Sequence, residues 1–276
     1  MTESPATPTN AYNVSIRELV IALTLFVLTL VSAWWTVSLE FAIGLLIILT
    51  CHEMGHYVTA RHYRVSVSLP YFIPFPYLSP FGTMGAVIKM RSVLRSRRVL
   101  FDIGIAGPLA GIPPALAATA WGLQHSTLVP EADILDGQLE YGRSLLWMLM
   151  ERWTFGPIPD GVTVMCDSWA LAGWTGLFVT ALNLLPVGQL DGGHVLFGIF
   201  GRRGNRISWM ILAALVVLGA FYPGWWFLVL LLFVTRIRKP AQTFDSTPLG
   251  PVRIFLGAFV LLFFVLTFIP KPIQLP

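Results

Sequence analysis

A short stretch limits what this chain can be, because it places three ionisable side chains in an otherwise apolar segment. His52, Glu53 and His56 follow closely on the apolar run 41–49. A helix through this run is apolar enough to enter a membrane, where each charged group at the bilayer centre costs about 2.5–3.5 kcal/mol. Ionisable residues at such a cost indicate a functional site; the alternative is that neighbouring helices satisfy the three side chains.

The spacing of these residues predicts a metal site. Side chains four residues apart lie nearly one above the other on a helix, so the imidazoles of His52 and His56 can share one metal ion. Glu53 is one step further round the helix and can reach a water molecule on the metal. Two imidazole ligands and a carboxylate general base form the H-E-x-x-H pattern of zinc hydrolases.

The composition predicts a membrane protein. Of the 276 residues, 55% are hydrophobic and only 12% are charged, and the mean hydropathy is +0.72. Soluble domains are nearer 25% charged. The net charge of +4 is small, and the basic residues lie at the ends of apolar runs, so we expect no nucleic-acid partner. The fold class is therefore an all-α polytopic membrane protein.

Apolar runs of sufficient length predict six to seven transmembrane helices. The run 207–234 is either one long span or two short ones that bend at Pro223 and Gly224. The expected spans are 16–37, 41–62, 100–122, 168–185, 207–234 and 254–269.

The same pattern predicts the domain organisation. Residues 1–15 are polar and are expected to form a disordered leader, followed by a single integral-membrane domain over 16–270. Within it we expect a catalytic core at about 40–200 and C-terminal helices over 207–269. Leu139 to Trp153 has the apolar pattern of an amphipathic interfacial helix.

The charges between the spans predict the orientation. Residues 61–98 hold seven basic residues and no acidic one, whereas the loop 124–167 holds seven acidic residues and two arginines. Basic segments remain in the cytosol, so we expect a cytosolic N-terminus and an external acidic loop. The ends of the second and fourth spans then lie on the same side, where Asp191 can meet His52 and His56.

Residues 65–90 fit neither a span nor an ordinary loop. Their prolines forbid a continuous helix, and the alternation at 65–69 and the run 85–90 predict two strands. We expect a small membrane-associated β-hairpin or re-entrant segment that is buried against protein. Its free edge can add an extended peptide by main-chain hydrogen bonds. An amphipathic surface hairpin without a role in substrate binding is the alternative.

Two further polar residues lie in apolar surroundings. Asp191 is the expected third metal ligand, and its alternative role is the N-cap of a helix that starts at Gly192. Asp102 is expected either at a helix start or in a polar contact near the site. The small residues within 104–111 predict close packing between helices.

Taken together, the motifs resemble the site-2 protease family, which comprises intramembrane zinc metalloproteases that cut transmembrane segments in regulated intramembrane proteolysis. The resemblance covers roughly residues 40–200, in a form without the PDZ domain inserted in many bacterial relatives. The stretches that carry it are His52-Glu53-x-x-His56, Phe81-Gly82-Thr83-Met84-Gly85-Ala86, Gly107-Pro108-Leu109-Ala110-Gly111, and Asn183-x-x-Pro186 ahead of Leu190-Asp191-Gly192-Gly193.

The resemblance implies one zinc ion per chain, bound by His52, His56 and Asp191, with Glu53 as the general base. It also implies that Asn183 helps to position the substrate or to stabilise the oxyanion; its alternative role is an interhelical hydrogen bond.

Other residues are assigned less directly by the resemblance. His194 is expected either behind the metal ligands or in a packing or cap role. A further four residues belong to the segment that lines the substrate path in the family: Gly82, Thr83, Met84 and Gly85.

The expected partners are the lipid bilayer and transmembrane protein substrates, which are cut near the cytosolic face. We expect a multi-pass protein of a bacterial plasma membrane; the oligomeric state has no signal in the sequence. The main alternative is a membrane metal-binding protein or transporter that uses the same histidines and aspartate. A proteolytically silent adaptor is a second alternative, but metal binding or adaptor function alone does not require Glu53.

Overall fold

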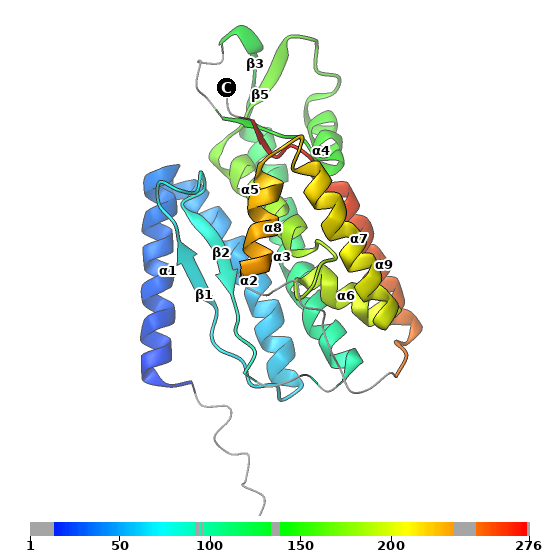
Figure 1. Cartoon of the computed structure of the whole chain (residues 1–276). Helices are drawn as coiled ribbons and strands as arrows, with labels where there is room; N and C mark the ends of the chain where they lie inside the picture. Colours follow the sequence, from blue (N-terminus) through cyan, green and yellow to red (C-terminus); the bar gives the residue numbers. More distant parts are fainter. Residues whose placement is uncertain (1–13, 92–93, 95, 134–138, 235–246, 275–276) are drawn as a thin grey trace, which may run out of the picture.

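The structure is a computed structural model that describes residues 14–91, 94, 96–133, 139–234 and 247–274. Over these residues the chain is mostly helical (Figure 1), as predicted, with three small two-stranded sheets. Among the described residues, three helices are long and apolar enough to cross a membrane: α1 (Ile16–Thr36), α2 (Leu39–His62) and α3 (Arg97–His125). The count of six to seven spans stays a prediction.

Serine caps begin the first two helices. The Ser15 hydroxyl accepts a hydrogen bond from the Glu18 amide, and the Ser38 hydroxyl accepts one from the Phe41 amide. Each hydroxyl satisfies an amide that has no partner inside its own helix. Because α1 ends at Thr36 and α2 begins at Leu39, the two apolar helices form an antiparallel pair.

Helix α3 lies in the middle of the molecule and contacts α2, α5 (Ser168–Asn183) and α6 (Asp191–Phe200) (Figure 1). It continues through Pro108, Pro113 and Pro114, and its glycines allow close approach of the neighbouring helices. Within 104–111, a Cβ at Gly104 would lie 2.6 Å from the His194 Cβ of α6, and a methyl group at Gly107 would overlap the His56 ring of α2. The prediction of close packing in this helix is therefore confirmed.

The segment after α2 forms an antiparallel hairpin of β1 (Tyr71–Pro74) and β2 (Thr83–Val87). The predicted strand at 65–69 is wrong, because that stretch makes only an isolated bridge from Val67 to Met90. The bridge does not extend into a ladder because, next to it, the Lys89 amide donates to the hydroxyl of Ser68 rather than to a backbone carbonyl. A side chain that competes for a backbone donor interrupts a strand ladder.

Helix α1 holds the hairpin at two places. Near its start, the Glu18 carboxylate accepts from the Leu69 amide at 2.9 Å and pairs with Arg91 at 2.7 Å. Near its end, the Ser32 hydroxyl donates to the Gly82 carbonyl at 2.6 Å. Glu18 and Ser32 are separated by about 21 Å along a helix. The hairpin therefore follows α1, a candidate membrane span, over most of its length, and its place in the membrane stays a prediction.

Gly82→Ala tests this attachment. Gly82 has φ +70°, and a Cβ there would lie 2.6 Å from the Ser32 carbonyl oxygen and 2.7 Å from the Ala33 Cα. We expect the variant to lower the free energy of unfolding by about 1–3 kcal/mol beyond the cost of the positive φ alone, because the overlap is with backbone. Denaturant titration in detergent micelles measures the difference.

Gly161→Ala is the matched control for Gly82→Ala. Its φ of +77° carries similar backbone strain, but a Cβ there has nothing within 4 Å. Equal losses of stability in the two variants would mean that the contact with α1 does not hold the hairpin.

The acidic loop and the C-terminus meet at one end of the molecule. Strand β3 (Thr127–Pro130) pairs with β5 (Val162–Met165), and β4 (Glu140–Tyr141) pairs with β6 (Ile273–Gln274). The short 3-10 helix η2 (Glu131–Asp133) follows β3. These strand pairs had no counterpart in the predicted fold.

The predicted amphipathic helix is α4 (Leu145–Phe155), which begins later than expected because the Ser144 hydroxyl caps it. Its exposed face carries Leu149 at 59% and Trp153 at 81% exposure, as an interfacial helix requires.

The predicted run 207–234 forms two helices, α7 (Arg202–Leu218) and α8 (Gly224–Val234), on either side of the turn at Tyr222 and Pro223. The run is thus broken into two helices at the predicted turn, and their role as two short spans stays a prediction. The last predicted span is α9 (Pro251–Thr267).

Asp102 is neither a metal-site residue nor a cap. Its carboxylate accepts two hydrogen bonds from Arg253 of α9 at 2.7 Å and one from the Tyr63 hydroxyl at 2.6 Å. The hydrogen bond to the Asp102 carboxylate raises the pKa of Tyr63, so the Tyr63 hydroxyl stays a donor. The cluster ties α9 to the ends of α2 and α3 that lie away from the acidic loop.

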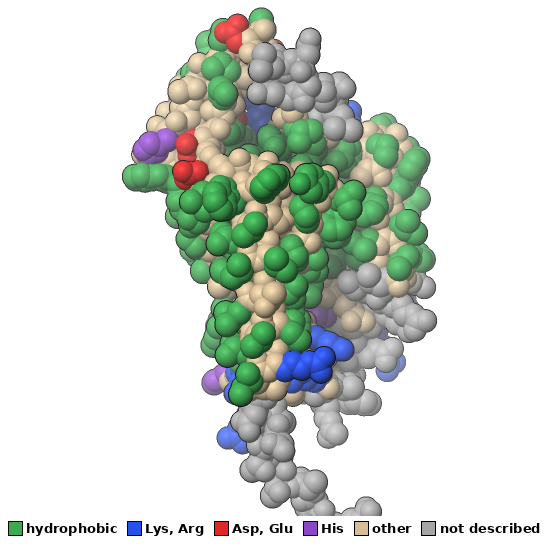
Figure 2. All heavy atoms as spheres, turned by 90° about the vertical axis from the view of Figure 1, so that its left-hand side faces the viewer, with side chains coloured by type: hydrophobic (Ala, Val, Ile, Leu, Met, Phe, Trp, Pro, Cys, Tyr) green, Lys and Arg blue, Asp and Glu red, His purple; other side chains and the backbone are tan. Residues whose placement is uncertain are grey.

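Figure 2 shows how charge is arranged on the face formed by α1. Hydrophobic side chains cover its broad middle, Lys and Arg side chains lie toward one end, and Asp and Glu side chains lie toward the other. An apolar belt between oppositely charged ends is the arrangement expected of a membrane protein.

Candidate metal centre

Helix α2 positions two of the three predicted ligands. His52 and His56 are one turn apart, and their side chains are 3% and 13% exposed. The His56 Nδ1 atom lies 2.7 Å from the Ile103 carbonyl oxygen of α3. A carbonyl only accepts, so Nδ1 carries the proton and the Nε2 atom of a neutral His56 presents a lone pair. Hydrogen bonding of this kind selects the tautomer that a metal ligand needs.

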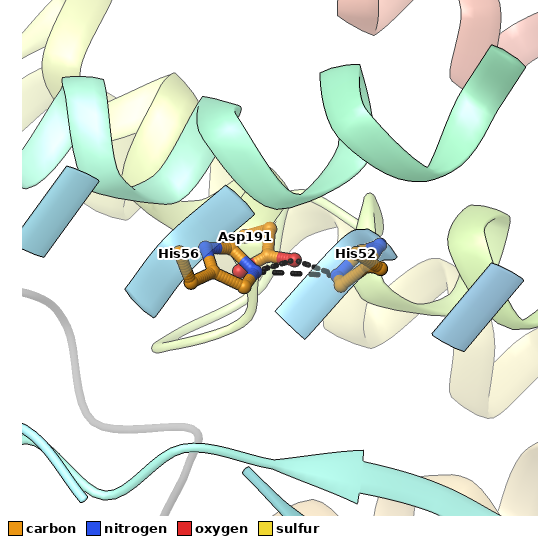
Figure 3. A group of neighbouring side chains, drawn as sticks. All are labelled: His52, His56 and Asp191. Atoms are coloured by element: carbon orange, nitrogen blue, oxygen red, sulfur yellow. Dashed lines mark hydrogen bonds and ion pairs between the residues drawn. The ribbon is translucent and has the colours of Figure 1, made fainter. Parts of the chain in front are cut away.

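Asp191 completes the cluster from α6. Its Oδ2 atom lies 3.2 Å from the Nε2 atom of His52 and 3.2 Å from the Nε2 atom of His56, and the two nitrogens are also 3.2 Å apart. Figure 3 shows the three side chains pointing toward one another from the two helices. The prediction that two stretches far apart in the sequence meet here is confirmed.

The donor atoms fit a tetrahedral zinc ion. Zn–N and Zn–O bonds of about 2.0–2.1 Å separate neighbouring ligand atoms by about 3.3–3.4 Å in a tetrahedron. The three donor atoms lie 3.2 Å apart, so they match one face of such a tetrahedron. Among the described residues, His52, His56 and Asp191 are the group that can hold a metal ion.

The alternative role of Asp191 as an N-cap is wrong. Leu190 is the cap residue and Asp191 is the first residue inside α6, with its carboxylate turned to the histidines. The turn after α5 makes this possible, because a methyl group at Gly192 would overlap the Leu184 carbonyl. Only glycine lets the start of α6 pack so closely on that turn.

Asn183 is the last residue of α5, and its Nδ2 atom lies 3.4 Å from the Nε2 atom of His52. The residue therefore lies beside the metal centre. Its predicted role with the substrate stays a prediction, since the contact also joins α5 to α2.

Glu53 and His194 are both buried next to the cluster. Glu53 is 4% exposed, and its carboxylate interacts electrostatically with His52, His56 and Asp191. His194 packs against α3, where a Cβ at Gly104 would lie 2.6 Å from the His194 Cβ. His194 therefore packs on α3, and its predicted place behind the metal ligands stays a prediction.

The four predicted substrate-path residues separate into two pairs. Gly82 packs on α1, and the Thr83 hydroxyl donates to the Ile73 carbonyl and accepts from the Gly85 amide, so both serve the hairpin itself. Met84 is 42% exposed, and a Cβ at Gly85 would lie 4.0 Å from Val179 of α5. Of the four residues, Met84 is exposed and Gly85 is buried, and their predicted role with the substrate stays a prediction.

The part played by α3 was missed at the sequence level. The carbonyl of Ile103 contacts His56, and Gly107 lies against the same ring. One signal was present: Gly107 and Gly111 are four residues apart, like the two histidines, so both pairs repeat once per helical turn.

The profile of Peptidase family M50 matches residues 40–221, well over half of the chain. The chain belongs to peptidase family M50. This confirms the family that the motifs indicated, and the matched residues of this M50 chain include all three predicted ligands and Glu53.

Curated plant proteins are similar to this M50 chain. The probable zinc metalloprotease EGY1, chloroplastic, of Arabidopsis thaliana is 36% identical over 239 residues, which cover 84% of this chain and 43% of that protein. The protein of the same name from Oryza sativa subsp. japonica is 36% identical over 243 residues, covering 84% and 41%. EGY2 of Arabidopsis thaliana is 27% identical over 236 residues, covering 82% and 40%.

The M50 chain thus spans less than half the length of these relatives. Their names place them in chloroplasts, whereas we expected a bacterial plasma membrane for this chain; that location stays a prediction.

Proposed function

We propose that this chain is an intramembrane zinc metalloendopeptidase that hydrolyses peptide bonds in or near transmembrane segments of other membrane proteins. The convergence of His52, His56 and Asp191 beside a buried Glu53 supports the proposal most strongly. Its occurrence on a candidate membrane span of an M50 chain supports the membrane setting. The metalloprotease names of the EGY relatives point the same way.

The three donor atoms would hold one zinc ion, leaving the fourth position to water. Bound there, zinc supplies a Lewis acid and lowers the pKa of that water toward 7. The Ile103 carbonyl keeps the His56 Nε2 atom unprotonated, which prepares the site for the metal.

The remaining steps belong to the side chains of this chain. Glu53 accepts the proton of the attacking water and then delivers it to the leaving amine. The amide of Asn183, which lies beside His52, donates to the oxygen that becomes negatively charged as the carbonyl is attacked.

The hairpin presents the substrate. A transmembrane helix hides its carbonyls in internal hydrogen bonds, so the bond to be cut must first be unwound. The unwound segment adds as a strand along β2 beside the exposed Met84, and its backbone groups are satisfied there.

The membrane arrangement follows from the charges. Residues 16–270 form one integral-membrane domain with six to seven spans, and its catalytic core covers about 40–200. The N-terminus and the metal centre lie toward the cytosolic face, because the basic segment 61–98 lies at that end. The acidic loop 124–167 lies on the opposite side, and residues 1–15 form a leader, of which 1–13 lie outside the described residues.

Metal removal tests this function directly. The purified chain is reconstituted in liposomes with a single-span substrate, and cleavage products are identified by mass spectrometry before and after chelation. We expect about one zinc ion per chain by elemental analysis, loss of cleavage to the background rate on chelation, and recovery on adding one equivalent of zinc.

Two results would contradict the proposal. Cleavage that persists in zinc-free protein would exclude a metallopeptidase. Bound zinc with transport of the ion across the liposome membrane and no cleavage of any substrate would favour the metal-transport alternative.

A further inference from the structure

Helix α3 contacts both helices that carry the predicted ligands. Some of its residues contact a ligand side chain, and others form hydrogen bonds to the helix that bears one. It lies between α2, which bears the two histidines, and α6, which begins with Asp191 (Figure 1). A metal centre assembled from separate helices is only as well defined as the packing that holds the helices in register. The geometry of the metal centre therefore depends on how α3 packs against these two helices.

On the side of α2, α3 is shaped around the His56 ring. The Ile103 carbonyl accepts from His56 Nδ1 at 2.7 Å, and a methyl group at Gly107 would overlap the Nε2 atom of the same ring. One turn further along, a Cβ at Gly111 would lie 3.1 Å from the His52 Cβ. Any side chain at Gly107 must displace the atom that faces the metal.

On the side of α6, α3 holds the helix at the end opposite Asp191. The Arg97 guanidinium donates from Nε to the Gly198 carbonyl and from Nη2 to the Ile199 carbonyl, each at 2.8 Å. These carbonyls belong to the last turn of α6, where helix carbonyls have no internal partner and a cation is favourable. A Cβ at Gly198 would lie 2.5 Å from the Phe101 ring, so the two helices also interlock there.

These contacts link Arg97 to the carboxylate mechanically. Helix α6 has ten residues, with Asp191 first and Ile199 next to last. A helix this short moves as one body, so a shift of its C-terminal end along α3 carries Asp191 with it.

We propose that α3 is the positioning element of the metal centre, with Gly107 and the Ile103 carbonyl orienting His56 and with Arg97 holding α6 so that Asp191 meets the histidines. Gly107 and Arg97 are positioning residues. The inference rests on the metal site of the proposed function but not on the peptidase reaction.

Arg97→Gln tests the hold on α6, with Arg98→Gln as the matched control. Arg98 is the next residue of the same helix, is exposed, and donates to the Pro248 carbonyl instead of to α6. We measure zinc affinity by chelator competition and the visible spectrum of the Co²⁺-substituted protein, which reports ligand geometry. We expect Arg97→Gln to weaken zinc binding by about 10–100-fold and to change the spectrum, and Arg98→Gln to do neither.

Arg97→Lys separates positioning from folding. Lysine keeps the charge but offers a point donor instead of a planar fork, so we expect zinc binding between wild type and Arg97→Gln. If Arg97→Lys and Arg97→Gln have lower melting temperatures but wild-type zinc affinity and spectrum, Arg97 is only a structural cap and the inference is wrong.

Gly107→Ala tests the clearance around His56, with Gly122→Ala as control. A methyl at Gly122 overlaps the Ala170 backbone of α5, which bears no ligand, so it disturbs the packing of the same helix elsewhere. We expect the folded fraction of Gly122→Ala to keep its zinc and that of Gly107→Ala to lose it. Equal zinc binding in the two variants overturns the role of Gly107. A wild-type chain that binds no zinc would instead overturn the proposed function itself.

Discussion

Glu53→Gln is expected to lower the rate of peptide cleavage by about 10²–10⁴-fold and to leave zinc binding intact. Glutamine keeps the size of the side chain but cannot take a proton from water. The three donor atoms that converge on the metal position come from His52, His56 and Asp191, so the charge of Glu53 is not needed to hold the metal. Initial rates on the same single-span substrate, together with zinc analysis of the same preparation, measure both effects.

Glu40→Gln is the control for this variant. Glu40 lies in the first turn of the same helix and is exposed. Glu40→Gln therefore removes the same charge from α2, but away from the metal centre. A Glu53→Gln protein that cleaves at the wild-type rate would show that another group is the base. One that loses both zinc and activity would assign Glu53 to the metal rather than to the proton.

Asp191→Asn is expected to weaken zinc binding strongly. The loss should exceed the roughly 10–100-fold that is typical when a residue hydrogen-bonded to a metal ligand is replaced. The amide is neutral and a poor donor to zinc, so two imidazoles would be left to hold the ion. Cleavage should fall to the background rate with it. Chelator competition gives the affinity, and elemental analysis gives the zinc content after gel filtration.

Asp167→Asn is the matched control for Asp191→Asn, because it makes the same change at the start of another helix. The Asp167 carboxylate caps α5 by accepting from the Trp169 amide, and asparagine caps a helix about as well as aspartate. We therefore expect little change in stability or zinc content. Wild-type zinc affinity in Asp191→Asn would place the third ligand elsewhere.

The hairpin shows where sequence reasoning fell short. Two strands were predicted between α2 and α3, but at 65–69 and 85–90 instead of Tyr71–Pro74 and Thr83–Val87. The shift arises from the Ser68 hydroxyl, which takes the Lys89 amide, and from the attachment to Glu18 and Ser32 of α1. Hydrophobic periodicity does not reveal these hydrogen bonds, because they involve side chains or residues far apart in the sequence.

The kind of site could be predicted from the amino-acid sequence. His52 and His56 face the same way because the helical repeat is local, and the order of the predicted spans indicated that Asp191 could meet them, as the structure shows. The membrane class and the M50 family likewise follow from residues read in order.

How the helices around the metal centre pack could not be predicted from the sequence. The carbonyl of Ile103 on His56, the clearance at Gly107 and the grip of Arg97 on α6 all depend on the register of α3 against its neighbours. Many registers of apolar helices bury similar surface, and lipid is as apolar as their side chains. Periodicity therefore leaves the register open, and close contacts at glycines and a guanidinium between helices select it.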